Sequence, residues 1–93
     1  MRTIERSGQF KADYKLIKKQ PRHRSNVDDL LREVVGLLVA STPMPEKFSD
    51  HPLSGDWDGY RDCHLKPDLV LIYKADEDVL RLARFGSHSN LFR

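Results

Sequence analysis

Three histidines and two aspartates in the second half of the chain are the residues whose types could carry out chemistry. His51, His64 and His88 occur in three separate segments. Asp62 lies two residues before His64, and Asp68 follows it across an expected turn. An imidazole titrates near neutral pH and can accept or donate a proton, and a nearby carboxylate can orient the ring. Each of these residues alone is most simply a surface or structural group, so we expect chemistry only if the five side chains converge.

The alternation of side chains along an expected strand, Tyr60–Leu65, sharpens this expectation. Side chains of a strand point alternately to its two faces, so Tyr60, Asp62 and His64 share one face. Cys63 and Leu65 share the other. The first set is too polar for a core face, whereas the second suits one. We therefore expect Asp62 and His64 on an accessible face of a sheet and Cys63 in the core.

Cleavage of RNA is a reaction that such a set can perform. RNA carries its own nucleophile, the 2′-hydroxyl beside each phosphate, so a base, an acid and a cation suffice. Each proton-transfer group contributes typically about 10²–10⁴-fold to the rate. Arg84 and Arg81, on the last expected strand, can supply the cation or can form surface salt bridges instead. Trp57 and Phe92 can stack on an unpaired base, although Phe92 can equally anchor the C-terminal tail.

Metal and thiol chemistry are less favoured by the pattern. Three histidines and an aspartate can bind zinc, but the sequence has no H-E-x-x-H pattern and no pair of cysteines. Cys63 is the single cysteine, and its neighbour His64 should point to the opposite face of the strand. We therefore expect an inert core thiol and a site without a metal or another cofactor.

The elements that must position these residues follow from hydrophobic spacing. A helix should begin after Ser7 and end at Pro21, and a capping box at Ser25 should begin a second helix with a broad apolar face. A long loop, 42–58, precedes three closely spaced strands. This order, β-α-α-β-β-β, predicts an α+β fold in which two N-terminal helices pack on one face of an antiparallel sheet. The expected strands are 2–6, 60–65, 69–74 and 79–85.

Length and charge limit the class of protein. The 93 residues suit one domain, and they contain neither a membrane-length apolar run nor a signal peptide. A single cysteine fits a reducing cytoplasm. The net charge is +2, but residues 1–24 carry eight Lys and Arg against two acids. This basic end can contact a polyanion or can simply be a solvated helix face.

Several motifs of the chain resemble the YafQ branch of the RelE/ParE toxin superfamily. The segment DHPLSGDWDGYRDCHLKPDLVLIYK, the tail FGSHSNLF and the early segment SGQFKADYKL carry this resemblance, which covers nearly the whole chain. Two positions depart from the pattern. Leu69 stands where relatives often have tryptophan, and Cys63 stands where a small residue is common. Neither position belongs to the expected acid–base set.

The resemblance implies a RelE-like fold and a toxin that cuts mRNA on the ribosome without a metal. It implies a DinJ-like ribbon-helix-helix antitoxin as partner, together with the ribosome and mRNA. It implies a catalytic centre of His51, His64, Asp68 and His88, which Asp62 and Phe92 support. It also implies that the basic first helix contacts ribosomal RNA through Lys15, Lys18, Lys19 and Arg22.

Two other functions on the same fold remain open at this point. A ParE-like toxin would inhibit DNA gyrase and would need no histidine cluster. A non-catalytic RNA-binding module would use the basic helix alone. Within the favoured function, we assign His51 or His64 as the base and His88 as the acid, although interacting groups share their titration.

Overall fold

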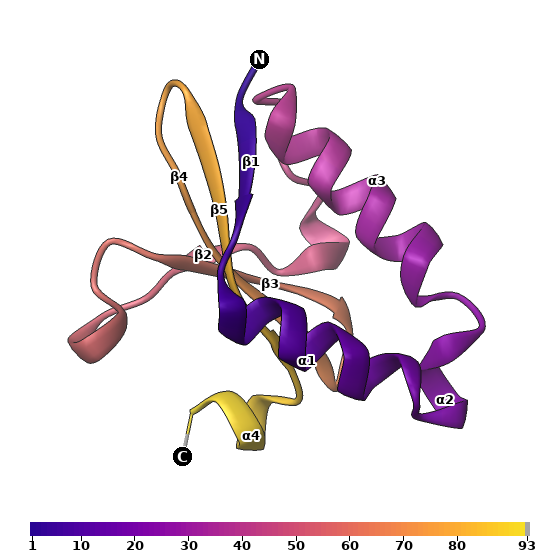
Figure 1. Ribbon diagram of the computed structural model, residues 1–93. Coiled ribbons are helices and arrows are strands. Elements are labelled where there is room, and N and C mark those ends of the chain that lie inside the picture. Colours follow the sequence, from indigo (N-terminus) through magenta and orange to yellow (C-terminus); the bar gives the residue numbers. More distant parts are fainter. Residues whose placement is uncertain (93) are drawn as a thin grey trace.

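The computed structural model describes residues 1–92 as a five-stranded sheet with helices on both of its sides (Figure 1). Among these residues, no helix combines the length and the apolar composition that crossing a membrane requires. The elements are β1 (Thr3–Arg6), α1 (Gly8–Lys18), α2 (Pro21–Arg24), α3 (Val27–Val39), η1 (Glu46–Phe48), β2 (His51–Pro52), η2 (Gly55–Trp57), β3 (Arg61–Lys66), β4 (Leu69–Ala75), β5 (Val79–Gly86) and α4 (His88–Leu91).

The strands lie in the order β1-β5-β4-β3-β2. As expected, β3, β4 and β5 form an antiparallel meander. The expectation of a purely antiparallel sheet is wrong, because β1 pairs with β5 in parallel, from Thr3 opposite Val79 to Arg6 opposite Leu82. All four residues of β1 are exposed, so no alternation of burial indicates the partner or the direction of this strand. The chain also adds the two-residue strand β2 from within the long loop.

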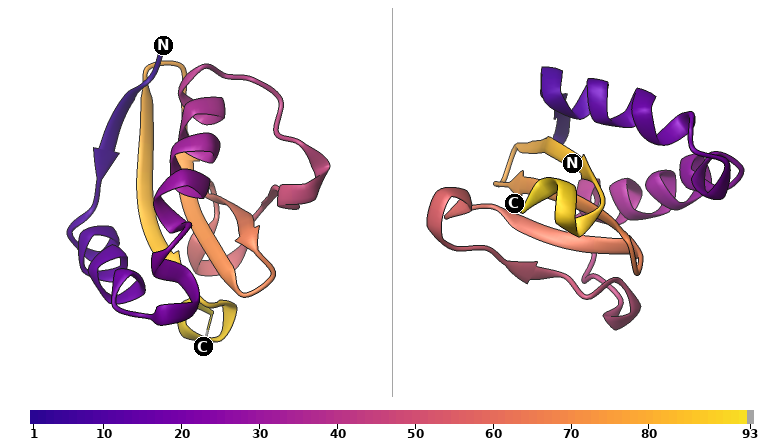
Figure 2. Two further views of the ribbon diagram at one scale, coloured as in Figure 1. Left: turned by 90° about the vertical axis from the view of Figure 1, so that its right-hand side faces the viewer. Right: turned by 90° about the horizontal axis from the view of Figure 1, so that it is seen from below.

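The main core lies between the N-terminal helices and one face of the sheet (Figure 2). Ser7 caps α1 as expected, since its side chain accepts a hydrogen bond from the backbone N–H of Phe10 at 2.9 Å. The apolar face of α3 packs into this core as expected, through Val27, Val34 and Leu38. The expectation that α3 is the main helix on the sheet is wrong, because α1 contacts the sheet more extensively, along β5. The buried residues of this core are Phe10, Ile17, Val27, Val34, Leu38, Phe48, Cys63, Leu65, Leu69, Leu71, Tyr73, Leu80, Leu82 and Phe85.

The opposite face of the sheet carries a smaller apolar cluster. Its buried members are Val70, Ile72, Ala83 and Leu91. The short helix α4 contributes Leu91 to this cluster, and aromatic side chains of the long loop and the C-terminal tail pack around it. This second face is therefore partly covered, and polar side chains can gather beside the cluster.

The connection between α1 and α3 differs from the expectation. Pro21 does not merely end the first helix but also begins α2. Proline has no backbone N–H, and a residue in the first turn of a helix does not need one. Asn26, not Ser25, precedes α3, and no side-chain cap is formed there. His23 looked like a solvated residue of a basic linker, but only 2% of it is exposed. Although the sequence around His23 is polar, His23 is buried where α2 contacts the sheet at Lys66.

Candidate active site

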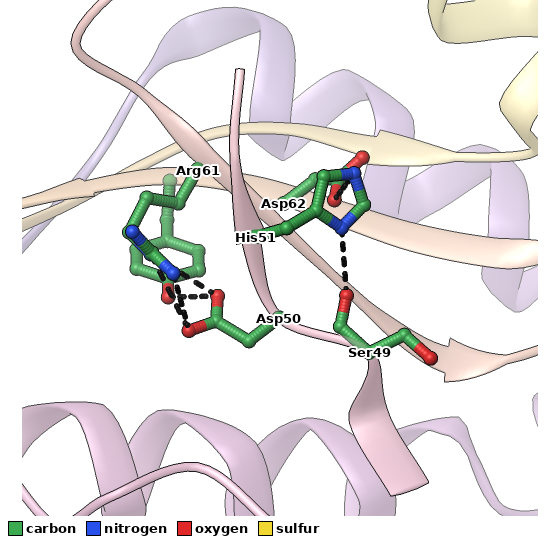
Figure 3. Close-up of polar contacts among 6 residues, drawn as sticks. Ser49, Asp50, His51, Arg61 and Asp62 are labelled. Carbon is green, nitrogen blue, oxygen red and sulfur yellow. Dashed lines mark hydrogen bonds and ion pairs between the residues drawn. The ribbon is translucent and has the colours of Figure 1, made fainter. Parts of the chain in front are cut away.

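His51 and Asp62 face each other across the pairing of β2 with β3. Their closest atoms are His51 Nε2 and Asp62 Oδ1, which are 3.1 Å apart (Figure 3). On the other side of the ring, His51 Nδ1 lies 2.8 Å from the carbonyl oxygen of Ser49. The imidazole is thus held between a backbone acceptor and a carboxylate. About half of the His51 side chain is exposed, whereas that of Asp62 is 2% exposed.

These two contacts determine where protons can lie on His51. A carbonyl oxygen only accepts hydrogen bonds, so Nδ1 carries a hydrogen directed at Ser49. In a neutral ring, Nε2 would then present a lone pair to the carboxylate of Asp62. A proton on the carboxyl of Asp62 or on Nε2 would remove the repulsion between two acceptors at 3.1 Å. A mobile proton at an exposed edge is what acid–base catalysis requires.

The burial of Asp62 favours the protonated form of its carboxyl group. Burial raises the pKa of the Asp62 carboxyl above its usual range, while the positive charges of three histidines oppose that rise by smaller amounts. Asp62 Oδ1 has an ionic contact with His51 but no contact of hydrogen-bond geometry within residues 1–92. A buried acceptor without a hydrogen-bond donor is costly for a fold, and such groups are concentrated at functional sites.

His64 and His88 complete the group around Asp62. His64 shares the face of Asp62 on β3, as the alternation predicted, and its ring centroid is 6.3 Å from that of His51. His88 is the first residue of α4, and its ring centroid lies 4.7 Å from that of Phe92. The charges of both histidines act on the pKa of Asp62. The structure therefore brings together three histidines from β2, β3 and α4 around one buried carboxylate.

Asp50 anchors the segment that carries His51, and the sequence reasoning missed it. Its carboxylate accepts hydrogen bonds from the Tyr73 hydroxyl at 2.5 Å and from Arg61 Nη2 at 3.2 Å (Figure 3). Burial, and then the bond to Asp50, raise the pKa of Tyr73 above its usual range. The sequence offered one indication of this role: Asp50 directly precedes His51, and an arginine, Arg61, lies near the start of the next expected strand. Asp50 and His51 thus fix the loop to both faces of the sheet.

Asp68 has a different environment from the one expected. Its carboxylate lies 3.1 Å from Arg22 Nη1 and 3.8 Å from His23 Nε2. Lys66 Nζ lies 3.2 Å from the other ring nitrogen of His23. Asp68 therefore makes its ion pairs with α2 rather than with His64 across the turn. The carboxylate in contact with a histidine of the candidate site is Asp62.

The two arginines proposed to supply a cation are both paired. Arg81 Nη2 lies 3.3 Å from Glu5 on the exposed edge of the sheet. Arg84 Nε lies 2.8 Å from Asp13 on α1. Arg84 pairs with Ile72 of β4, and Ile72 pairs with Asp62 of β3. The Cα atoms of Arg84 and Asp62 therefore lie in the same row across the sheet. Arg84 is therefore the arginine nearer in register to the histidines.

The remaining expected site residues lie on different elements of the fold. The Trp57 and Tyr60 rings meet edge to face at 5.2 Å, beside the smaller apolar cluster. Lys15, Lys19 and Arg22 are exposed on or after α1. Lys18 differs because its Nζ lies 2.6 Å from Asp28 on α3. The basic surface of α1 is thus accessible, with one of its lysines held by the neighbouring helix.

Cysteine chemistry does not contribute to this site. Cys63 is fully buried in the main core, and burial raises the pKa of its thiol far above the usual range. The expected inert core thiol is confirmed. In the part of the chain that the structure describes, no three His, Cys, Asp or Glu side chains are placed to hold a metal ion.

Comparisons with known proteins show which family the chain resembles over its length. The mRNA interferase toxin YafQ of Escherichia coli K12 is 46% identical over 92 residues, which are 98% of this chain and 96% of that protein. A chain in the crystal structure of the E. coli DinJ–YafQ complex is 42% identical, with a TM-score of 0.85 and full coverage of both chains. A metal-bound toxin from Helicobacter pylori is 45% identical, with a TM-score of 0.86 over 99% of this chain and 100% of that one.

The likeness of fold confirms the expected α+β architecture, apart from the parallel pairing of β1. A model of the family described as "Bacterial toxin of type II toxin-antitoxin system, YafQ" matches residues 2–93. The chain therefore belongs to the YafQ family of type II toxin–antitoxin toxins.

Proposed function

We propose that this protein is an endoribonuclease toxin that cleaves mRNA on the ribosome in the bacterial cytoplasm. The observation that carries the proposal is the group of three histidines around the buried Asp62, on an accessible edge of the sheet. The identity to the E. coli mRNA interferase toxin over nearly the full chain supports the same activity.

The proposed reaction uses only proton transfers. His64, or His51 through Nε2 when that nitrogen carries no proton, takes the proton from a 2′-hydroxyl, whose oxygen then attacks the adjacent phosphorus. The bond from phosphorus to the 5′-oxygen breaks, and His88 gives a proton to that leaving oxygen. The products are a 2′,3′-cyclic phosphate and a 5′-hydroxyl end. Asp62 supports the step because its carboxylate, 3.1 Å from His51 Nε2, favours a positive charge on that ring near the phosphate.

Other residues position the substrate in this proposal. Phe92, beside the His88 ring, and Trp57 offer flat faces on which an unpaired base can stack. Arg84 and Arg81 supply positive charge along β5. The resemblance also assigns a catalytic role to Asp68, and its contacts suggest that it acts at a distance from the histidines, through Arg22 and His23.

The proposed partners follow from the same evidence. The exposed basic residues of α1 and α2, with Lys18, contact ribosomal RNA and place the toxin beside the mRNA. A ribbon-helix-helix antitoxin of the DinJ type neutralises the toxin, by analogy with the E. coli DinJ–YafQ complex.

The test adds the purified protein to a translation extract that contains one defined mRNA, and then maps the RNA ends. We expect cuts in mRNA on ribosomes, no cuts in the same RNA without ribosomes, and loss of the cuts for His88→Ala. Gyrase inhibition with intact mRNA would instead indicate a ParE-like toxin. Salt-sensitive RNA binding without any cleavage would indicate a binding module.

A further inference from the structure

Helix α1 covers a part of the sheet edge that β1 leaves open. The pairing of β1 with β5 ends at Leu82, and β5 continues to Gly86. At this point the backbone N–H of Phe85 donates a hydrogen bond to Asp13 Oδ2 at 3.0 Å. Asp13 is 8% exposed, on the face of α1 that packs against β5. A carboxylate thus takes the place of a neighbouring strand.

The same carboxylate holds the side chain of Arg84. Arg84 Nε donates to Asp13 Oδ2 at 2.8 Å, and Arg84 Nη2 donates to Oδ1 at 3.3 Å. Gln9 adds a bond to Oδ1 at 3.2 Å. Two parallel bonds to a planar guanidinium fix its orientation, which one bond to a lysine would not do. Asp13 therefore determines where the guanidinium of Arg84 points.

The Arg84 side chain lines a hollow between α1 and the start of α4. The bonds to Asp13 use one N–H of Nε and one of Nη2, and three N–H groups remain on Nη1 and Nη2. This hollow, of about 370 Å³, is lined by Asp13 and His23 and by Ser87 and Asn90, which lie on either side of His88 in the chain, although His88 itself does not line it. The backbones of Arg84 and Asp62 are two strand spacings apart, which is about 10 Å. This separation places Arg84 beside the reacting phosphate, not on it.

We propose that Asp13 is a positioning residue that aims Arg84 at an mRNA phosphate neighbouring the one that the histidines cleave. This inference rests on the proposed function and adds to it a residue of α1. A purely structural role explains less, because a neutral Asn would also cap the Phe85 N–H. The charge and the two-bond geometry matter only for Arg84, whose side chain is 26% exposed.

The main experiment is a double-mutant cycle for cleavage on programmed ribosomes. Asp13→Asn and Arg84→Ala should each lower the rate at subsaturating toxin by about ten- to a hundredfold, since misplacement of a binding group has effects of this size. The double variant should be no slower than Arg84→Ala alone, because Asp13 acts only through Arg84. Glu33→Gln, which removes an exposed carboxylate paired with Lys47 at 3.5 Å, is the matched control and should cleave at the wild-type rate.

A chemical rescue separates positioning from folding. Millimolar guanidinium ion should restore part of the activity of Arg84→Ala, because Asp13 remains to bind the ion. It should not restore Asp13→Asn/Arg84→Ala. If Asp13→Asn fails to fold, the single variants Arg84→Lys and Arg84→Ala are compared instead of the cycle. Lysine keeps the charge without the planar fork, so we expect the same loss of rate.

Three results would overturn this inference while leaving the proposed function in place. These are wild-type cleavage by Arg84→Ala or Arg84→Lys, losses that add in the double variant, and equal rescue with and without Asp13. Absence of cleavage by the wild-type protein on ribosomes would instead overturn the proposed function itself. All rates are compared at a temperature at which thermal melting shows each variant to be folded.

Discussion

Two histidine–aspartate pairs of this protein have opposite burial. In the first pair, His51 is 53% exposed and its partner Asp62 is 2% exposed. In the second pair, the side chain of His23 is 3% exposed and its partner Asp68 is 45% exposed. The atoms of the first pair are 3.1 Å apart, and those of the second are 3.8 Å apart. The same two residue types thus form two pairs that differ in which member is buried.

The buried member of each pair determines what the pair can do. Burial raises the pKa of Asp62, so its carboxyl group keeps a proton to a higher pH than usual, beside the exposed ring of His51. Burial, and then the charge of Lys66, lower the pKa of His23, so the second pair favours a neutral ring. The first pair is suited to proton transfer with a substrate. The second is suited to joining α2 to the turn between β3 and β4.

The largest effect that would test this contrast is on cleavage. His51→Ala should lower the rate of mRNA cleavage on ribosomes by about 10²–10⁴-fold, because it removes a proton-transfer group. The position of the urea transition serves as the control for folding. Cleavage by this variant at the wild-type rate would remove His51 from the proposed mechanism.

The corresponding change in the second pair should affect stability instead. His23→Ala should lower the free energy of unfolding by about 2–3 kcal/mol, because it leaves a cavity and removes the ring that lies beside Lys66. Cleavage per folded molecule should stay near the wild-type value. Urea unfolding measures the first quantity, and ribosome assays corrected for the folded fraction measure the second. A stable, inactive His23→Ala would reverse the assignment of the two pairs.

A smaller effect concerns the pH dependence of stability at Asp62. Its pKa is raised in the folded state, so its favourable contribution is full below the unfolded pKa, about 3.9, and is lost as the pH rises through the folded pKa. Asp62→Asn cannot titrate, so its stability relative to the wild type should increase with pH over this range. Urea midpoints from pH 4 to pH 8 measure this difference. A difference that stays constant with pH would contradict the raised pKa.

The smallest expected effect is the pH dependence that His23 contributes. Its pKa is lowered in the folded state, so its contribution to stability is present above the unfolded pKa, about 6.5, and is lost as the pH falls towards the folded pKa. Replacement by Gln should flatten the decrease of the urea midpoint between pH 7 and pH 5. His51→Gln provides the comparison at the exposed pair.

The parts of the fold with regular patterns could be predicted from the sequence. The apolar run of β4, the broad face of α3 and the alternation on β3 correctly placed Cys63 in the core and Asp62 with His64 on the other face. The expectation that Asp62 is accessible there is wrong, because Asp62 is buried. The burial of His23 could not be predicted, because its neighbour Lys66 comes 43 residues later in the chain. Asp13 could have been found, since it occupies the apolar face of α1 between Phe10 and Ile17.

The parallel pairing of β1 with β5 has a consequence for the synthesis of the protein. Residues 3–6 are made early, but their strand partners are residues 79–82, more than seventy residues later in the sequence. His88 is made later still. The pairing of β1 and the histidine group can therefore form only after residues 79–88 have been made, because non-local pairing must wait for both partners. A chain interrupted before residue 79 would thus have neither the partner of β1 nor the third histidine of the group.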